Sequence, residues 1–109
     1  METQKENDKP KESKIQELQM LEQGLQNTLM QKQAFQMELS EAQAALKELK
    51  NSGDEVFKII GQLMIKSEKS KISEDLENKE KILKLRISTL EKQEISLTEK
   101  FEALRKEII

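Results

Sequence analysis

Apolar residues recur at alternating spacings of three and four through two long stretches of this chain, and this pattern restricts its fold more than any other feature. In residues 15–50 the repeated positions hold Leu18, Leu21, Leu25, Phe35, Leu39, Ala42, Leu46 and Leu49, with Thr28 and Lys32 completing the series. In residues 72–109 a leucine returns every seven residues, at Leu76, Leu83, Leu90, Leu97 and Leu104. A sustained period of about 3.5 residues is typical of helices that bury one narrow stripe against another helix.

The period changes to two between these helices. Residues 51–54 read Asn-Ser-Gly-Asp, and Gly53 is expected to take the left-handed conformation that ends many helices. Residues 55–68 then alternate around Gly61 and Gln62, which predicts a β-hairpin, because glycine at the first turn position suits a type II′ turn. Either Ser70 or Ser73 is expected to cap the second helix.

The predicted hairpin is apolar on both faces. The type II′ turn sets Ile60 opposite Leu63, and the same register continues along both strands. A two-stranded hairpin is marginal in water by itself, and one that is apolar on both sides requires neighbours. We therefore expect this hairpin to join subunits through the residues Phe57, Ile59, Ile60, Leu63, Met64 and Ile65.

One antiparallel register brings nearly all of the repeated apolar positions of the two helices face to face. It pairs Leu49 with Leu76 at one end and Leu21 with Leu104 at the other. The same register sets Lys32 opposite Glu94, so two polar residues of opposite charge share the seam. Since polar residues inside a seam can fix alignment, we expect this pair to help specify the register; the alternative is that both side chains reach water and contribute nothing.

The composition excludes several classes of function. Charged residues make up 37% of the 109 positions and the net charge is −2 with both signs interspersed, so a basic nucleic-acid-binding stripe is not predicted. The chain has no histidine or cysteine, which removes the commonest general base and the thiol nucleophile. The three glycines are too scattered for a phosphate-binding loop. We expect no enzyme activity, cofactor or metal site.

The composition also bears on the location of the protein in the cell and on its division into a tail and a domain. No apolar stretch is long enough for a membrane span, and a cytoplasmic location is the simplest expectation. Residues 1–14 are charged, contain no apolar residue except Met1, and are expected to form a disordered tail. The remaining residues, 15–109, are expected to form one domain, with helices at 15–50 and 72–109 and a β-hairpin at 55–68.

The order helix, hairpin, helix resembles the β-type subunits of prefoldin. The segment from Phe57 to Lys66 is similar to the hairpin of that family, which runs from an aromatic residue and a lysine through a glycine to three apolar residues and a second lysine. Residues 31–33 and 90–94 resemble archaeal β-type subunits in particular. The fold class expected from this resemblance is mainly α, a long antiparallel coiled-coil hairpin with a β-hairpin inserted between its helices.

The resemblance also implies a function. A chain of this kind would be a molecular chaperone subunit that holds unfolded or nascent proteins without ATP and passes them to a cytosolic chaperonin. It would assemble with α-type partners as a hexamer of two α and four β subunits, and bind its clients at the tips of the coiled coils. The candidate tip residues are Ile15, Leu18, Met20, Leu21, Ile108 and Ile109.

Two alternatives remain open from the sequence. Leu18 and Leu21 lie on the seam, so they complete the coiled coil whether or not they also contact clients. The chain as a whole could instead be a coiled-coil scaffold or oligomerisation adaptor for one specific partner, because heptads fit that function equally well. The two-faced hairpin argues against a scaffold, which has no need of it.

Overall fold

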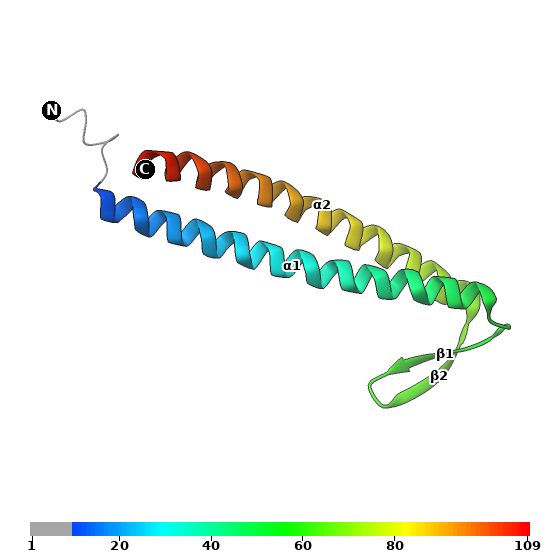
Figure 1. Cartoon of the computed structure of the whole chain (residues 1–109). Helices are drawn as coiled ribbons and strands as arrows, with labels where there is room; N and C mark the ends of the chain where they lie inside the picture. The colour runs from blue at the N-terminus through cyan, green and yellow to red at the C-terminus, as the bar shows by residue number, and fades with distance from the viewer. Residues whose placement is uncertain (1–9) are drawn as a thin grey trace. The chain divides into compact units, whose positions relative to one another are not determined.

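The computed structural model describes residues 10–109, which form two long helices with a β-hairpin between them (Figure 1). Helix α1 spans Lys11–Asn51 and is followed by strands β1, Glu55–Ile60, and β2, Leu63–Glu68. Helix α2, Lys69–Ile108, follows β2 directly. The predicted fold class, mainly α with an inserted hairpin, is confirmed.

The described residues fall into two compact units, which are treated separately below. The terminal unit combines residues 10–32, which include the start of α1, with residues 89–109, and the hairpin unit comprises residues 33–88. Each unit contains one part of α1, one part of α2 and, in the hairpin unit, both strands. The expectation of one domain over residues 15–109 stays a prediction.

Both helices begin earlier than the apolar pattern predicted. Helix α1 starts at Lys11 rather than residue 15, so residues 11–14 are helical and not part of a disordered tail; residues 1–9 of that predicted tail lie outside the described residues. The Lys14 N–H donates to the Pro10 carbonyl at 3.1 Å, which closes the first turn. Proline suits this position because it has no N–H to leave unpaired at the helix start.

Helix α2 starts at Lys69, three residues before the predicted start, so Ser70 and Ser73 lie inside the helix and the prediction of either as its cap is wrong. The Ser73 hydroxyl instead lies 3.5 Å from the Glu77 carboxylate, one turn further along.

The end of α1 also differs from the prediction. Among residues 10–109 the only positive φ is at Gly61, so Gly53 does not take the left-handed conformation expected of it. Ser52 closes the helix instead, because its N–H and its hydroxyl both donate to the Leu49 carbonyl, at 3.3 and 2.8 Å. Lys69 donates to the Ser52 carbonyl at 2.9 Å and so links the two ends of the hairpin.

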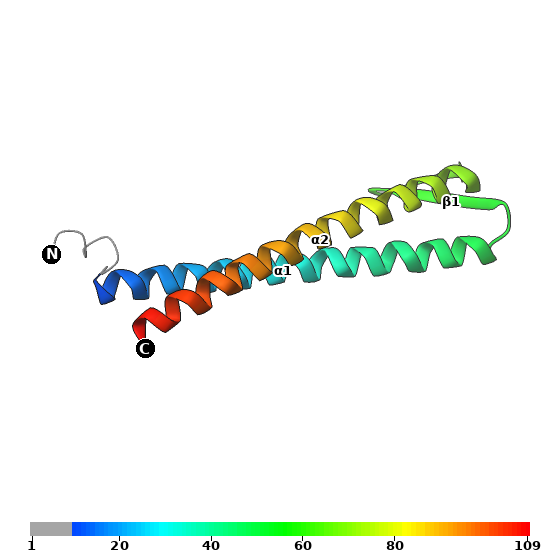
Figure 2. The ribbon, with the colours of Figure 1, turned by 90° about the horizontal axis from the view of Figure 1, so that it is seen from above.

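The hairpin has the register that the sequence predicted. Strands β1 and β2 pair antiparallel with Ile60 opposite Leu63 and Glu55 opposite Glu68. Gly61 has a φ of 60°, whereas Gln62 has no positive φ. A positive φ at the first turn residue alone fits a type II′ turn and not type I′, which requires it at both. The hairpin turns back along the flanking helix segments of its own unit (Figures 1 and 2).

Positions of the predicted seam form most of the core of each unit, and Val56 of β1 adds to it in the hairpin unit. In the terminal unit the buried side chains are Thr28, Leu90 and Leu104. In the hairpin unit they are Ala42, Leu49, Val56, Leu83 and Ile87. Leu83, at 2% exposure, is the most deeply buried. Within residues 10–109, neither helix carries an apolar run long enough to cross a bilayer.

Candidate functional site

The hairpin presents a large apolar surface to solvent. All six residues predicted to join subunits are exposed, by 45% to 69% of their surface. They belong to both faces of the two-stranded sheet, because directly paired residues share a face and neighbours along a strand alternate. Phe57, Ile59 and Met64 lie on one face, whereas Ile60, Leu63 and Ile65 lie on the other. The chain's own helices therefore cover only a small part of either face of the hairpin.

One hairpin residue anchors the strands to the helices. Val56, which is not one of the six residues predicted to join subunits, is buried. It lines a shallow apolar groove with Leu49 of α1 and Leu76 of α2. The hairpin face that carries Phe57 forms another part of the lining of this groove. The start of β1 is therefore packed against both helices, whereas the rest of the hairpin is exposed.

The predicted polar pair in the seam makes a direct contact in the terminal unit. The Lys32 ammonium donates to a Glu94 carboxylate oxygen at 2.6 Å. The Lys32 side chain is 17% exposed and that of Glu94 is 34% exposed, so the contact is only partly shielded from water. The predicted juxtaposition is confirmed; its role in setting the register stays a prediction.

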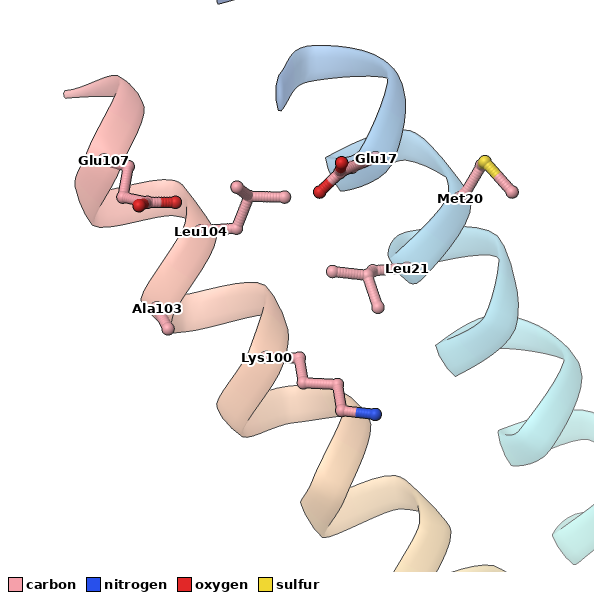
Figure 3. Close-up of a pocket in the computed structure, with 7 residues that line it drawn as sticks. All are labelled: Glu17, Met20, Leu21, Lys100, Ala103, Leu104 and Glu107. Atoms are coloured by element: carbon pink, nitrogen blue, oxygen red, sulfur yellow. The ribbon is translucent and has the colours of Figure 1, made fainter. Parts of the chain in front are cut away.

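The terminal unit has a groove where the first turns of α1 pass the last turns of α2 (Figure 3). Leu21 and Leu104 point toward each other across it, and Met20 and Ala103 extend its apolar surface. Glu17, Lys100 and Glu107 supply charged groups around this surface. Of these seven residues, the sequence analysis had named Met20 and Leu21 as tip residues and Leu104 as a seam residue. It missed Glu17, Lys100, Ala103 and Glu107, because only paired helices reveal which outer residues flank one groove.

The six predicted tip residues differ in their exposure. Met20 and Ile109 are the most exposed, at 74% and 88%, and Ile15 is exposed at 38%. Leu18, Leu21 and Ile108 are half-buried, which for Leu18 and Leu21 is expected because they also belong to the seam. All six lie in the terminal unit, near the start of α1 or the end of α2. Their contact with clients stays a prediction.

The helices also carry features outside the predicted sites. Met30, Met37 and Leu85 are well exposed on the helix surfaces. In the hairpin unit the Arg86 guanidinium lies 5.6 Å from the centre of the Phe35 ring, a cation–π distance. No three acidic side chains among residues 10–109 gather in a group able to hold a metal ion.

Comparison with known proteins identifies the family. The family model described as "Prefoldin subunit" matches residues 12–109. The chain belongs to the prefoldin family. Among its relatives, the prefoldin subunit beta of Thermococcus onnurineus is 38% identical over 94 residues, which cover 84% of this chain and 81% of the relative. That of Methanothrix thermoacetophila is 33% identical over 99 residues, covering 89% and 82%.

The three-dimensional comparison agrees with the sequence comparison. The crystal structure of the prefoldin beta subunit from Thermococcus strain KS-1 is similar with a TM-score of 0.83 and 35% identity, covering 93% of this chain and 90% of the other. The predicted resemblance to β-type prefoldin subunits is confirmed. Prefoldin is a family of chaperones rather than of enzymes, and this chain is a prefoldin chaperone subunit, of a family that binds unfolded proteins without ATP.

Proposed function

We propose that this chain works in the cytoplasm as the β-type subunit of a hexamer with two α-type and four β-type chains. The hairpin joins the subunits, and the paired helix ends hold unfolded proteins until a cytosolic chaperonin receives them. The chain itself carries out no chemical reaction. Membership of the prefoldin family makes a complex with α-type subunits the expected state. Membership of a family of chaperones favours this function over the alternative of a coiled-coil scaffold.

The observation that carries the proposal is the exposed apolar hairpin. Six large apolar side chains on two strands are about half exposed or more, and within residues 10–109 the sheet consists of β1 and β2 alone, so each strand has one free edge there. Contiguous apolar surface of this kind marks a protein interface, and free strand edges supply hydrogen-bonding groups for further strands. Hairpins of neighbouring subunits would cover the apolar surface and pair with the free strand edges.

The apolar groove of the terminal unit supports the client-binding part of the proposal. Met20 is long, unbranched and exposed beside Leu21, and such a side chain adapts to partners of different shape. A single groove lined by these few residues is expected to bind an unfolded client only weakly. Several grooves in one complex acting on one client gain strength because each contact raises the effective concentration of the next.

Light scattering tests the proposal as a whole. A chemically unfolded client is diluted into buffer without ATP, with and without the chain assembled with its α-type partner. We expect the assembled complex to suppress aggregation at near-stoichiometric amounts. Aggregation that proceeds unchanged in the presence of a fully assembled complex would refute client holding.

The assembly role of the hairpin has its own test. Replacing Ile60 and Leu63 by threonine removes apolar surface at the end of the hairpin and keeps two residues that favour strands. Because both side chains are more than half exposed, the helices should keep their circular dichroism signal, whereas native mass spectrometry should detect smaller species. A matched control replaces Ile82 and Leu85, equally exposed residues of α2, and should leave the hexamer intact. An intact hexamer in the Ile60 and Leu63 variant would count against the assigned interface.

A further inference from the structure

The methionines within residues 10–109 all lie at the surface. Met20, Met30, Met37 and Met64 are exposed by 67% to 74%, and none of them is among the buried side chains that form the cores of the two units. The packing of both cores therefore uses aliphatic side chains other than methionine. A chemical change at these four thioethers should leave the helices paired, because no core contact is lost.

Met20 differs from the other three in its surroundings. It lines the groove of the terminal unit together with Leu21, Ala103 and Leu104. Figure 3 shows its side chain extending from α1 on the side away from α2, whereas Leu21 points toward Leu104. Met20 therefore lies at the rim of the apolar surface, and at 74% exposure its sulfur is open to small molecules in solution.

From this position we propose that Met20 is a site of oxidation by peroxides and that its sulfoxide weakens the hold of this subunit on unfolded clients. The thioether sulfur attacks one oxygen of hydrogen peroxide, so that an S–O bond forms while the O–O bond breaks. The second oxygen leaves as water with both peroxide hydrogens. The sulfur loses two electrons and the peroxide gains them. The inference rests on the client-binding function proposed above.

Oxidation changes the property for which a methionine suits this groove. The thioether is apolar and flexible, and so it packs against clients of different shape. The sulfoxide is polar, and its oxygen loses hydrogen bonds to water when an apolar side chain packs against it. We expect an apolar peptide to bind the oxidised groove about three- to tenfold more weakly, as for the loss of part of one apolar contact. Several grooves that act on one client multiply this loss.

The test oxidises the complex assembled from the full chain and its α-type partner. Hydrogen peroxide is added and then removed with catalase before any client is present, so that the client itself stays unmodified. Peptide mapping by mass spectrometry locates the sulfoxides. Fluorescence anisotropy with a labelled, methionine-free apolar peptide measures affinity, and light scattering measures client aggregation. We expect a sulfoxide at Met20, weaker peptide binding and less suppression of aggregation, with an unchanged circular dichroism signal.

Variants assign the effect to one methionine. Met20→Leu keeps an apolar side chain and has no sulfur, so its complex should hold clients equally well before and after peroxide. The matched control is Met30→Leu with Met37→Leu, which removes two comparably exposed thioethers of α1 that do not line the groove. This control complex should lose client holding on oxidation, as the unmodified complex does.

Three results would overturn the proposal. The first is a loss of client holding that Met20→Leu does not prevent. The second is complete conversion of Met20 to the sulfoxide with no change in peptide affinity. The third is a Met20 that stays reduced at a peroxide concentration that oxidises Met30 and Met37.

The measurements before peroxide separate this inference from the function on which it rests. If the untreated complex suppresses aggregation and oxidation of Met20 changes nothing, the chaperone function stands and the oxidation site is wrong. If the untreated complex neither binds the peptide nor suppresses aggregation, client holding by this groove is wrong, and the inference fails with it.

Discussion

Reversing the charges of Lys32 and Glu94 tests whether a polar pair in the seam fixes the alignment of the two helices. The variants are Lys32→Glu, Glu94→Lys and the double reversal. Each single reversal sets two like charges face to face where the ammonium and carboxylate are now 2.6 Å apart. The double reversal restores opposite charges at the same two positions, so the cycle isolates the interaction between them.

The exposed fractions of the two side chains determine how much each reversal is expected to change the free energy of unfolding. Lys32 is 17% exposed, so a carboxylate in its place is poorly solvated, and Lys32→Glu is expected to lower the free energy of unfolding by about 2 kcal/mol. Glu94 is 34% exposed, and a lysine there can extend into water, so Glu94→Lys is expected to cost about 1 kcal/mol. The double reversal should cost less than about 1 kcal/mol, which leaves a coupling free energy of more than about 2 kcal/mol.

Urea unfolding followed by circular dichroism at one fixed protein concentration measures these differences, since assembly is coupled to stability. The control cycle reverses Arg105 and Glu102, an exposed pair 3.2 Å apart within α2, for which a coupling of roughly 0.3 kcal/mol is expected. Added salt should remove the control coupling and leave part of the Lys32–Glu94 coupling. A seam coupling no larger than the control value would refute the role assigned to the pair.

Two further predictions concern the core and the hairpin turn. Leu83→Ala should lower the free energy of unfolding by about 3 kcal/mol because Leu83 is 2% exposed, whereas Leu85→Ala, at 69% exposure, should change it by less than about 0.5 kcal/mol; equal losses in urea unfolding would contradict this assignment of the seam. Gly61→Ala should weaken the hairpin by about 1 kcal/mol because of the φ of 60°, and so reduce the assembled fraction seen by native mass spectrometry. Gly53→Ala is its control, since Gly53 has no positive φ and an added Cβ there meets no atom within 4 Å; a hexamer unaffected by Gly61→Ala would show that the turn geometry is not needed for assembly.

The sequence predicted the features that depend on periodicity. The seam positions of both helices and the facing of Lys32 and Glu94 follow from one antiparallel register, because a one-residue shift would turn the leucines away from each other. The hairpin register follows similarly from the two-residue turn at Gly61, which fixes every cross-strand pair. These are long-range consequences of short repeating patterns.

The helix ends and the groove could not be predicted in the same way. Residues 11–14 are helical although they carry no apolar repeat, because polar residues such as lysine and glutamate favour helices and Pro10 supplies the first carbonyl. Ser52 rather than Gly53 closes α1, since a serine side chain can bond to the last free carbonyls without a left-handed residue. The charged lining of the terminal groove combines residues from outer positions of two helices, which no pattern along one helix reveals.

The most direct test of the central claim, that exposed apolar residues at the paired helix ends hold unfolded clients, compares two double substitutions in the aggregation assay without ATP. Met20→Ser with Ile109→Ser removes the two most exposed residues of the predicted tip. Met37→Ser with Leu85→Ser removes two comparably exposed apolar residues of the hairpin unit. We predict that both variants assemble with the α-type partner, that the first loses most of its suppression of client aggregation and that the second keeps it. Equal suppression by the two assembled variants would contradict the account.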